Sequence, residues 1–528
     1  MKFKIQSSKF KVTNSLLFGI LVLAAFLRLY RIQDYMTFLG DEGRDVLVAY
    51  NILHGHFTLL GPTASVGGFY FGPIYYYMMA PFLFLFNYNP VGPAVMVGLL
   101  GIATVWLVFI LGRKFFTTSV GLLAAFLYAI APVIIAYSRS SWNPNPVPFF
   151  SLLTVYFTYR GISENKQKFL LLAGIFLGIA IELHFIVLLL GAIVAIYLLL
   201  LRSHLAQGET LGKTLIVLIK QYAIVFLGFL IGWLPYLAFE VRHGFQNIQN
   251  FFHFVFLSGK VSSSNTNFFM TVGNVFFRFF GRLTTAFPPP EQLPKYTHPE
   301  IDFWYWGTII LGIASIILLG LQLYSAYRTK EKNRLLQLSF VAVWLFFGIS
   351  FFGFYKKQIY DYYFSFMYPL PFLLIANLIV FLWYRTIVTK VLAGILFFIL
   401  VYFNLQGVPF RYEPNRQLQQ MQTISHFINS KTNGKPFNFA LITGGNSDHA
   451  YRYFFTIWGH PPVTIENPVI DPQRKTVTDQ LLIVCESIPC YPLGNSLFEI
   501  AGFGRAEIVG HWNVSVVEIY RLVHYKQK

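Results

Sequence analysis

The sequence predicts a polytopic α-helical membrane protein that carries a small soluble α/β domain at its carboxyl end. Hydrophobic residues make up 55% of the chain and charged residues only 12%. Long apolar runs fill most of the first 400 residues, and charged and polar residues return after about residue 410. We therefore divide the chain into a membrane domain, 1–409, and a soluble domain, 410–528.

About eleven apolar runs have the length that crosses a bilayer as a helix, roughly 17 to 25 residues. The first follows a basic amino terminus and spans 15–29; we interpret it as a retained anchor because no small-residue cleavage site follows it. The others are expected at 92–111, 119–137, 146–159, 169–183, 184–201, 222–239, 302–324, 335–354, 363–383 and 391–405.

The formal net charge of +18 is an orientation signal, because the Lys and Arg residues gather in short loops between the apolar runs. It does not indicate a nucleic-acid partner. Threading the runs from a cytoplasmic amino terminus places these basic loops inside. It leaves three regions outside: the loop 31–91, the loop 240–300 and everything after residue 406.

The soluble domain alternates between strand and helix patterns. Ser447 is placed to cap its helix and Gly459 to end it. Cys485 and Cys490 are the two cysteines of the chain, and they form either a local disulfide or two free thiols. We expect strands at 437–442 and 480–484, a helix at 448–458, and an antiparallel pair formed by 507–509 and 514–522.

An acidic tetrad, Gly40-Asp41-Glu42-Gly43, followed by Arg44 and Asp45, lies just past the first span. The next residues have the spacing of an interfacial helix, 44–54, so the tetrad lies at the amino end of that helix. Carboxylates beside a bilayer are usually retained for a functional site. Capping of the helix by one of the carboxylates is the structural alternative.

Several features together resemble the polyprenol-phosphate-dependent glycosyltransferases of the GT-C fold. They are the first span, the outer-loop Asp41-Glu42-Gly43-Arg44, the helix that stops at Gly55, an aromatic segment through Gly72-Pro73, and the outer carboxyl-terminal domain. The chain looks most like the branch of protein O-mannosyltransferases and lipid A aminoarabinose transferases, with motif-level similarity confined largely to 39–77. The resemblance implies a polyprenyl-phosphate-linked sugar donor and a protein, lipid or glycan acceptor. It also implies an active site on the outer face of a prokaryotic plasma membrane.

Within this resemblance, Asp41 is expected to act as the base that takes the proton of the acceptor hydroxyl, and single displacement inverts the anomeric carbon. Glu42 or Asp45 would orient the base or the sugar. Arg44 would bind the donor phosphate. Some relatives need a divalent metal and others do not; because Asp41 and Glu42 alone make a weak site, we expect no obligatory metal or other cofactor.

The chain departs from its relatives where they carry a basic residue near the lipid phosphate, because Phe71 and Gly72 offer no charge. Phosphate binding is therefore expected first at Arg44, then at Lys357, which precedes Tyr360 at the entrance to a span. Arg139 is a further candidate.

Three polar residues interrupt apolar surroundings at outer turns: Asn143, Glu182 and His184. Each is either a substrate contact or a hydrogen-bonded structural group. Two other function classes stay open. A transporter would have this many spans but would place its carboxylates near the bilayer midplane. A lipid-linked glycan ligase or polymerase would need a larger basic outer loop.

Overall fold

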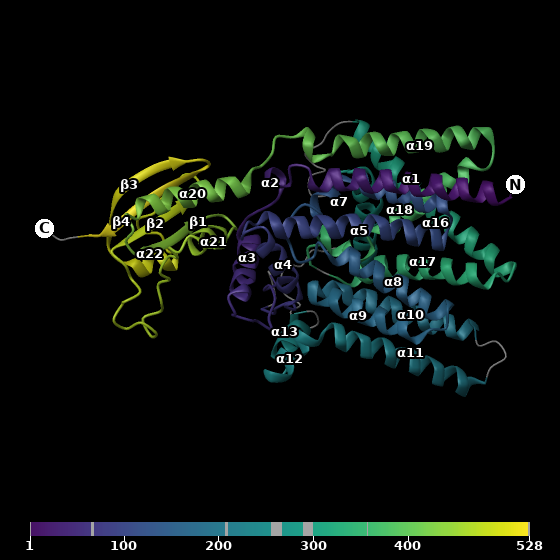
Figure 1. Ribbon diagram of the computed structural model, residues 1–528, viewed down its shortest axis with the longest axis horizontal. Helices are drawn as coiled ribbons and strands as arrows, with labels where there is room; N and C mark the ends of the chain where they lie inside the picture. Colours follow the sequence, from purple (N-terminus) through teal and green to yellow (C-terminus); the bar gives the residue numbers. More distant parts are fainter. Residues whose placement is uncertain are drawn as a thin grey trace.

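The computed structural model describes residues 2–64, 68–205, 210–254, 267–288, 299–355 and 357–525. The molecule is elongated. A helical bundle has the amino terminus at its far end, and a sheet domain at the opposite end carries the carboxyl terminus (Figure 1). The outer-loop helices α2 (Ile32–Tyr35), α3 (Gly40–Leu53) and α4 (Ile74–Leu85) lie between these two parts (Figure 1).

Every run predicted to cross the bilayer overlaps a helix of the bundle. Within the described residues, six helices are long and apolar enough to cross a membrane alone, or seven if the bent pair Asp361–Met367 and Pro369–Trp383 is one span. Several predicted crossings are shorter helices; the fourth and fifth predicted runs form helices of 17 residues each. The bundle helices are α1 (Lys2–Leu29), α5 (Val91–Phe115), α6 (Thr118–Ile130), α7 (Pro132–Tyr137), α8 (Val147–Ser163), α9 (Gln167–Leu183), α10 (Leu188–Leu205), α11 (Leu211–Gly232), α16 (Pro299–Arg328), α17 (Lys332–Ser350), α18 (Pro369–Trp383) and α19 (Ile387–Gln406).

Two helices of the bundle, α9 and α11, approach each other through glycines spaced four residues apart. A Cβ built on Gly174 would lie 2.1 Å from the carbonyl oxygen of Val225, and one built on Gly228 would lie 2.2 Å from that of Leu171. Small residues at this spacing let two membrane helices pack backbone against backbone. The close pairing of α9 with α11 is therefore encoded by glycine.

The carboxyl-terminal domain is a four-stranded mixed sheet with strand order β1-β2-β4-β3. β1 and β2 are parallel, and both β2–β4 and β4–β3 are antiparallel. The predicted strands, helix and closing antiparallel pair are all present, and Cys485 and Cys490 form a disulfide. The elements are α20 (Gln417–Lys431), β1 (Asn438–Ile442), α21 (His449–Ile457), β2 (Gln480–Cys485), α22 (Phe498–Phe503), β3 (Ala506–Val514) and β4 (Val517–His524).

This domain packs directly on the outer loop. The ring of Phe38 contacts those of Tyr453 and Phe454, with centroids 6.3 and 5.8 Å away. The amide of Phe38 donates to Gln417 Oε1 at 3.1 Å, and the amide of Arg416 donates to the carbonyl of Asp34 at 3.0 Å. The acidic tetrad and the carboxyl-terminal domain therefore lie at the same end of the bundle, as the predicted threading requires.

Candidate active site

The acidic tetrad forms the first turn of α3, so the helix begins four residues before the predicted interfacial segment. Glu42 is buried, and its Oε2 accepts a hydrogen bond from the amide of Leu39 at 3.0 Å. Burial raises the pKa of Glu42 to about 7. Glu42 thus caps the helix, which is the structural alternative that the sequence left open for one of the carboxylates.

Arg44 lies between the other two carboxylates of this turn. Its Nη1 donates to Asp41 Oδ1 at 3.0 Å, and its Nε and Nη2 donate to Asp45 Oδ1 at 2.9 and 2.8 Å. The Asp45 side chain is fully buried, whereas that of Asp41 is 51% exposed. Asp41 is therefore the carboxylate that a substrate can reach, and Arg44 holds it in place.

The expectation that Arg44 binds the donor phosphate needs revision. The guanidinium already serves two carboxylates, those of Asp41 and Asp45. Arg44 is therefore placed to orient Asp41 rather than to bind a phosphate.

Glu182 joins three segments of the outer face. Its side chain is fully buried, and its carboxylate accepts hydrogen bonds from the amides of Ile74 at 3.1 Å and Tyr236 at 3.2 Å, in the first turns of α4 and α12 (Leu234–Arg242). A Cβ built on Gly72 would lie 2.4 Å from the Glu182 side chain. Glu182 therefore occupies the space that a basic side chain at position 72 would need.

His184 and Asn143 are also held by protein contacts. The ring of His184 stacks on Phe71 with centroids 5.1 Å apart, and its Nδ1 accepts a hydrogen bond from the amide of Ile186 at 3.2 Å. Asn143 is buried and donates to the carbonyl of Leu183 at 2.7 Å. Asn143 and Glu182 are thus hydrogen-bonded within the protein, while the ring of His184 takes part in the aromatic contacts described below.

The structure also does not support the expectation that Arg139 binds the phosphate. It is 1% exposed, and its two terminal nitrogens donate to the carbonyls of Leu27 at 2.8 Å and Tyr30 at 2.7 Å. The guanidinium lies over the rings of Tyr35 and Phe410. Arg139 satisfies the last carbonyls of α1 and anchors this helix to the outer layer.

Lys357 and Tyr360 lie near the entrance to the bent pair, as expected. Lys357 Nζ donates to the carbonyl of Phe254 at 3.2 Å and lies 3.0 Å from the centroid of the Phe254 ring. Tyr360 is 43% exposed, and its ring stacks on that of Tyr362. Both remain candidates for substrate contact, although the ammonium of Lys357 is already partnered.

The structure adds a cationic cluster that the sequence analysis missed. Arg278 and Arg282 bracket η3 (Arg278–Arg282), a single π-helical turn that follows α14 (Phe268–Phe277), and both contact the carboxylate of Asp361. Arg278 Nη1 lies 2.8 Å from Asp361 Oδ1. Two guanidiniums share one carboxylate, so the described members of the cluster carry a net positive charge. The sequence feature that could have indicated this cluster is the pair of arginines four residues apart in an aromatic outer segment.

A series of aromatic contacts leads from α4 to the residues beside this cluster. Tyr75 on α4 bonds to Ser141 through their hydroxyls at 2.8 Å, and the ring of the next residue, Trp142, packs on Tyr362 with centroids 4.6 Å apart. Tyr362 adjoins Asp361 and also packs on His184. These contacts therefore link α4 to the residues beside Asp361.

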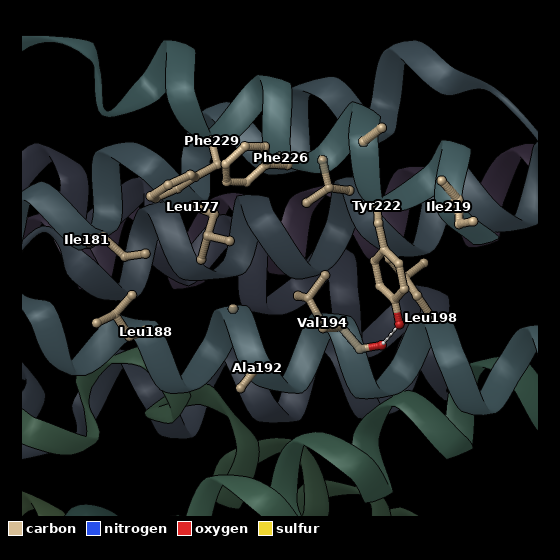
Figure 2. Close-up of a pocket in the computed structure, with 14 residues that line it drawn as sticks. Leu177, Ile181, Leu188, Ala192, Val194, Leu198, Ile219, Tyr222, Phe226 and Phe229 are labelled. Carbon is tan, nitrogen blue, oxygen red and sulfur yellow. Dashed lines mark hydrogen bonds between the residues drawn. The ribbon is translucent and has the colours of Figure 1, made fainter. Parts of the chain in front are cut away.

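A cavity of about 650 Å³ opens between α9, α10 and α11 (Figure 2). Its lining is apolar except for Tyr222, whose hydroxyl donates to the carbonyl of Ala195 at 2.8 Å. The cavity runs along the membrane-spanning helices and has Ile181, one residue from Glu182, in its lining. Among the described residues, no group of three or more His, Cys, Asp or Glu side chains is arranged to hold a metal ion.

Comparison with known proteins decides the fold. Residues 71–233 match the dolichyl-phosphate-mannose-protein mannosyltransferase family. The structure of ArnT from Cupriavidus metallidurans bound to undecaprenyl phosphate superposes with a TM-score of 0.59 at 12% identity, covering 96% of this chain and 97% of ArnT. The chain has the GT-C fold. The predicted similarity to polyprenyl-phosphate-dependent glycosyltransferases is thereby confirmed.

A second GT-C protein is similar over most of the chain. The archaeal oligosaccharyltransferase AglB from Archaeoglobus fulgidus, in complex with an inhibitory peptide and a dolichol-phosphate, gives a TM-score of 0.52 at 15% identity. The match covers 90% of this chain and 69% of AglB. No curated protein matches the chain in sequence. The GT-C fold and its apolar helices make this chain a multi-pass membrane protein.

Proposed function

We propose that this GT-C protein is an inverting glycosyltransferase that moves a sugar from a polyprenyl-phosphate donor to an acceptor hydroxyl on the extracytoplasmic face of the plasma membrane. One observation carries the proposal: the GT-C fold presents a single exposed carboxylate in the acidic turn, Asp41, which Arg44 holds beside the membrane. The solved relatives bind undecaprenyl phosphate or dolichol-phosphate. These ligands support the donor class.

The reaction needs one base and one anion site. The acceptor oxygen attacks the anomeric carbon while Asp41 takes its proton, and the bond from that carbon to the phosphate oxygen breaks on the opposite face. The polyprenyl phosphate leaves as an anion that needs no proton. Arg282, which is 24% exposed and shares Asp361 with Arg278, is suited to bind the phosphate.

The apolar cavity between α9, α10 and α11 suits the prenyl chain of the donor. Filling it should weaken binding of long-chain donors only. Gly191→Phe places a ring in the cavity, since the nearest atom to a Cβ there is 3.5 Å away. We expect about a tenfold higher KM for an undecaprenyl donor and no change for a donor with a two-unit prenyl chain.

Gly394→Phe is the matched control for this substitution. Gly394 is also a glycine inside a membrane helix, α19, and a Cβ built on it would have nothing within 4 Å. Equal donor kinetics for Gly191→Phe, Gly394→Phe and the unmodified protein would exclude the cavity as the binding site of the donor's prenyl chain.

The proposed orientation places the sheet domain outside the cell. The disulfide between Cys485 and Cys490 supports this placement, because disulfides persist in oxidising compartments. A cysteine introduced at exposed Ser515 should react with a membrane-impermeant maleimide in intact cells, and one at exposed Ser163, at the opposite end of the bundle, should react only after lysis. Labelling of a cysteine at Ser163 in intact cells would contradict the proposed orientation, because this position would then lie outside the cell.

The activity itself is tested with purified protein in lipid. A panel of undecaprenyl-phosphate sugars is offered with a Ser/Thr peptide, lipid A or a free glycan, and release of undecaprenyl phosphate is measured. We expect release to depend on one sugar and one acceptor class. A transporter would leave every donor intact, and a glycan ligase would release undecaprenyl phosphate only from a donor that carries an oligosaccharide, which the panel includes.

A further inference from the structure

The carboxyl-terminal domain docks on the two glycines of the acidic tetrad. The amide of Gly40 donates to Asn446 Oδ1 at 2.8 Å. A Cβ built on Gly40 would lie 2.1 Å from Ser447 Oγ, and one built on Gly43 would lie 2.3 Å from the amide of Ala450. The tetrad therefore needs glycine at both positions because the β1–α21 segment lies against the first turn of α3. The residues between and after these glycines, Asp41 and Arg44, lie at the edge of this contact.

The docking segment is held by hydrogen bonds from within its own domain. It leaves the carboxyl end of β1, beside the carboxyl end of the parallel strand β2, which is where open α/β sheets bind ligands. Glu486, which follows β2, accepts hydrogen bonds from Asn446 Nδ2 at 3.0 Å, Thr443 Oγ1 at 2.8 Å and the Tyr451 hydroxyl at 2.8 Å. The segment thus has one defined position relative to α3.

His449 is the first residue of α21 and lies at this contact. Ser447, which was expected to cap the helix, instead bonds to His449 Nδ1 through its hydroxyl at 2.9 Å. Asp448 lies 4.0 Å from the same nitrogen, and Arg452, Asp41 and Arg44 also act electrostatically on the ring. The side chain is 39% exposed, and within the described part of the chain its Nε2 has no hydrogen-bond partner. Burial lowers the pKa of the His449 imidazole.

We propose that His449 binds the acceptor, with its Nε2 forming a hydrogen bond to the acceptor group that enters next to Asp41, so that the carboxyl-terminal domain completes the active site. This inference rests on the proposed glycosyltransferase function. The acceptor is the partner assigned to His449 because the donor's lipid chain must lie on the bundle side of α3, whereas His449 belongs to the domain on the other side (Figure 1). The occupied Nδ1 fixes the ring and leaves Nε2 for the ligand.

Three substitutions separate this role from a structural one. In His449→Gln the side-chain amide reaches the position of Nε2, in His449→Asn it reaches only that of Nδ1, and His449→Ala reaches neither. Kinetics are measured with the donor and acceptor that support turnover in the panel above. We expect the alanine and asparagine variants to raise the acceptor KM about tenfold, and the glutamine variant to remain within about threefold. The donor KM and the slow donor hydrolysis without acceptor should be unchanged in all three.

His460→Ala is the matched control, because His460 is an exposed histidine just after the other end of α21. An acceptor KM that is unchanged in His449→Ala would overturn the proposal, as would recovery by asparagine rather than glutamine. A donor KM that rises as much as the acceptor KM would do the same. If the unmodified protein releases no undecaprenyl phosphate with any donor, the proposed function fails instead. The melting temperature of each variant shows whether it still folds. If His449→Gln and His449→Ala are equally stable, an acceptor KM restored only by glutamine cannot result from a difference in folding.

Discussion

Asp41→Asn should lower turnover by about a hundred- to ten-thousandfold, with donor binding little changed. Asparagine keeps the shape of the side chain and can still accept from Arg44 Nη1, which lies 3.0 Å from Asp41 Oδ1. It cannot take a proton from the acceptor. Turnover is measured as release of undecaprenyl phosphate under saturating donor, and donor affinity is measured separately by binding.

Asp34→Asn is the matched control for this experiment. Asp34 is another outer-loop aspartate that pairs with an arginine three residues away, Arg31, at 2.7 Å. We expect it to retain normal turnover. Near-normal turnover in Asp41→Asn would reject Asp41 as the base.

Arg282→Ala should raise the donor KM by about ten- to a hundredfold, because it removes one charge-assisted contact to the phosphate. Arg282→Lys should be intermediate, since an ammonium lacks the planar fork of a guanidinium. Direct binding of undecaprenyl phosphate to the purified protein checks the result without turnover. Arg44→Lys is the comparison variant, and it should leave donor affinity unchanged because Arg44 serves Asp41 and Asp45.

Asp361→Asn distinguishes anion binding from a structural ion pair at the same cluster. Neutralising the carboxylate that Arg278 and Arg282 share raises the local positive charge, so an anion site should bind undecaprenyl phosphate at least as tightly. A purely structural cluster would instead lose stability in Asp361→Asn and Arg282→Ala alike, because breaking a buried pair leaves a charge without its partner. Weaker phosphate binding in Asp361→Asn at unchanged stability would contradict the assignment.

The membrane fold was predictable because apolar length and the distribution of basic residues act locally along the chain. The strands and the helix of the sheet domain were predictable for the same reason, since their periodicities are local. The acidic tetrad was also recognisable, because carboxylates beside a span are costly and therefore conspicuous. Which of its carboxylates is exposed was not predictable. That depends on how α3 packs, which buries Glu42 and Asp45 and leaves Asp41 accessible.

The sequence by itself therefore determined a multi-pass membrane protein of GT-C type with an outer acidic turn. Only the tertiary structure decided which charged groups work together. The sequence singled out Arg139 and not Arg282, yet folding buries Arg139 against the end of α1 and places Arg282 beside Arg278 and Asp361. His449 reaches the acidic turn from about 400 residues away only because the sheet domain docks on Gly40 and Gly43. Contacts between residues so distant along the chain leave no periodic pattern in the sequence. They form only when whole helices and strands pack against one another.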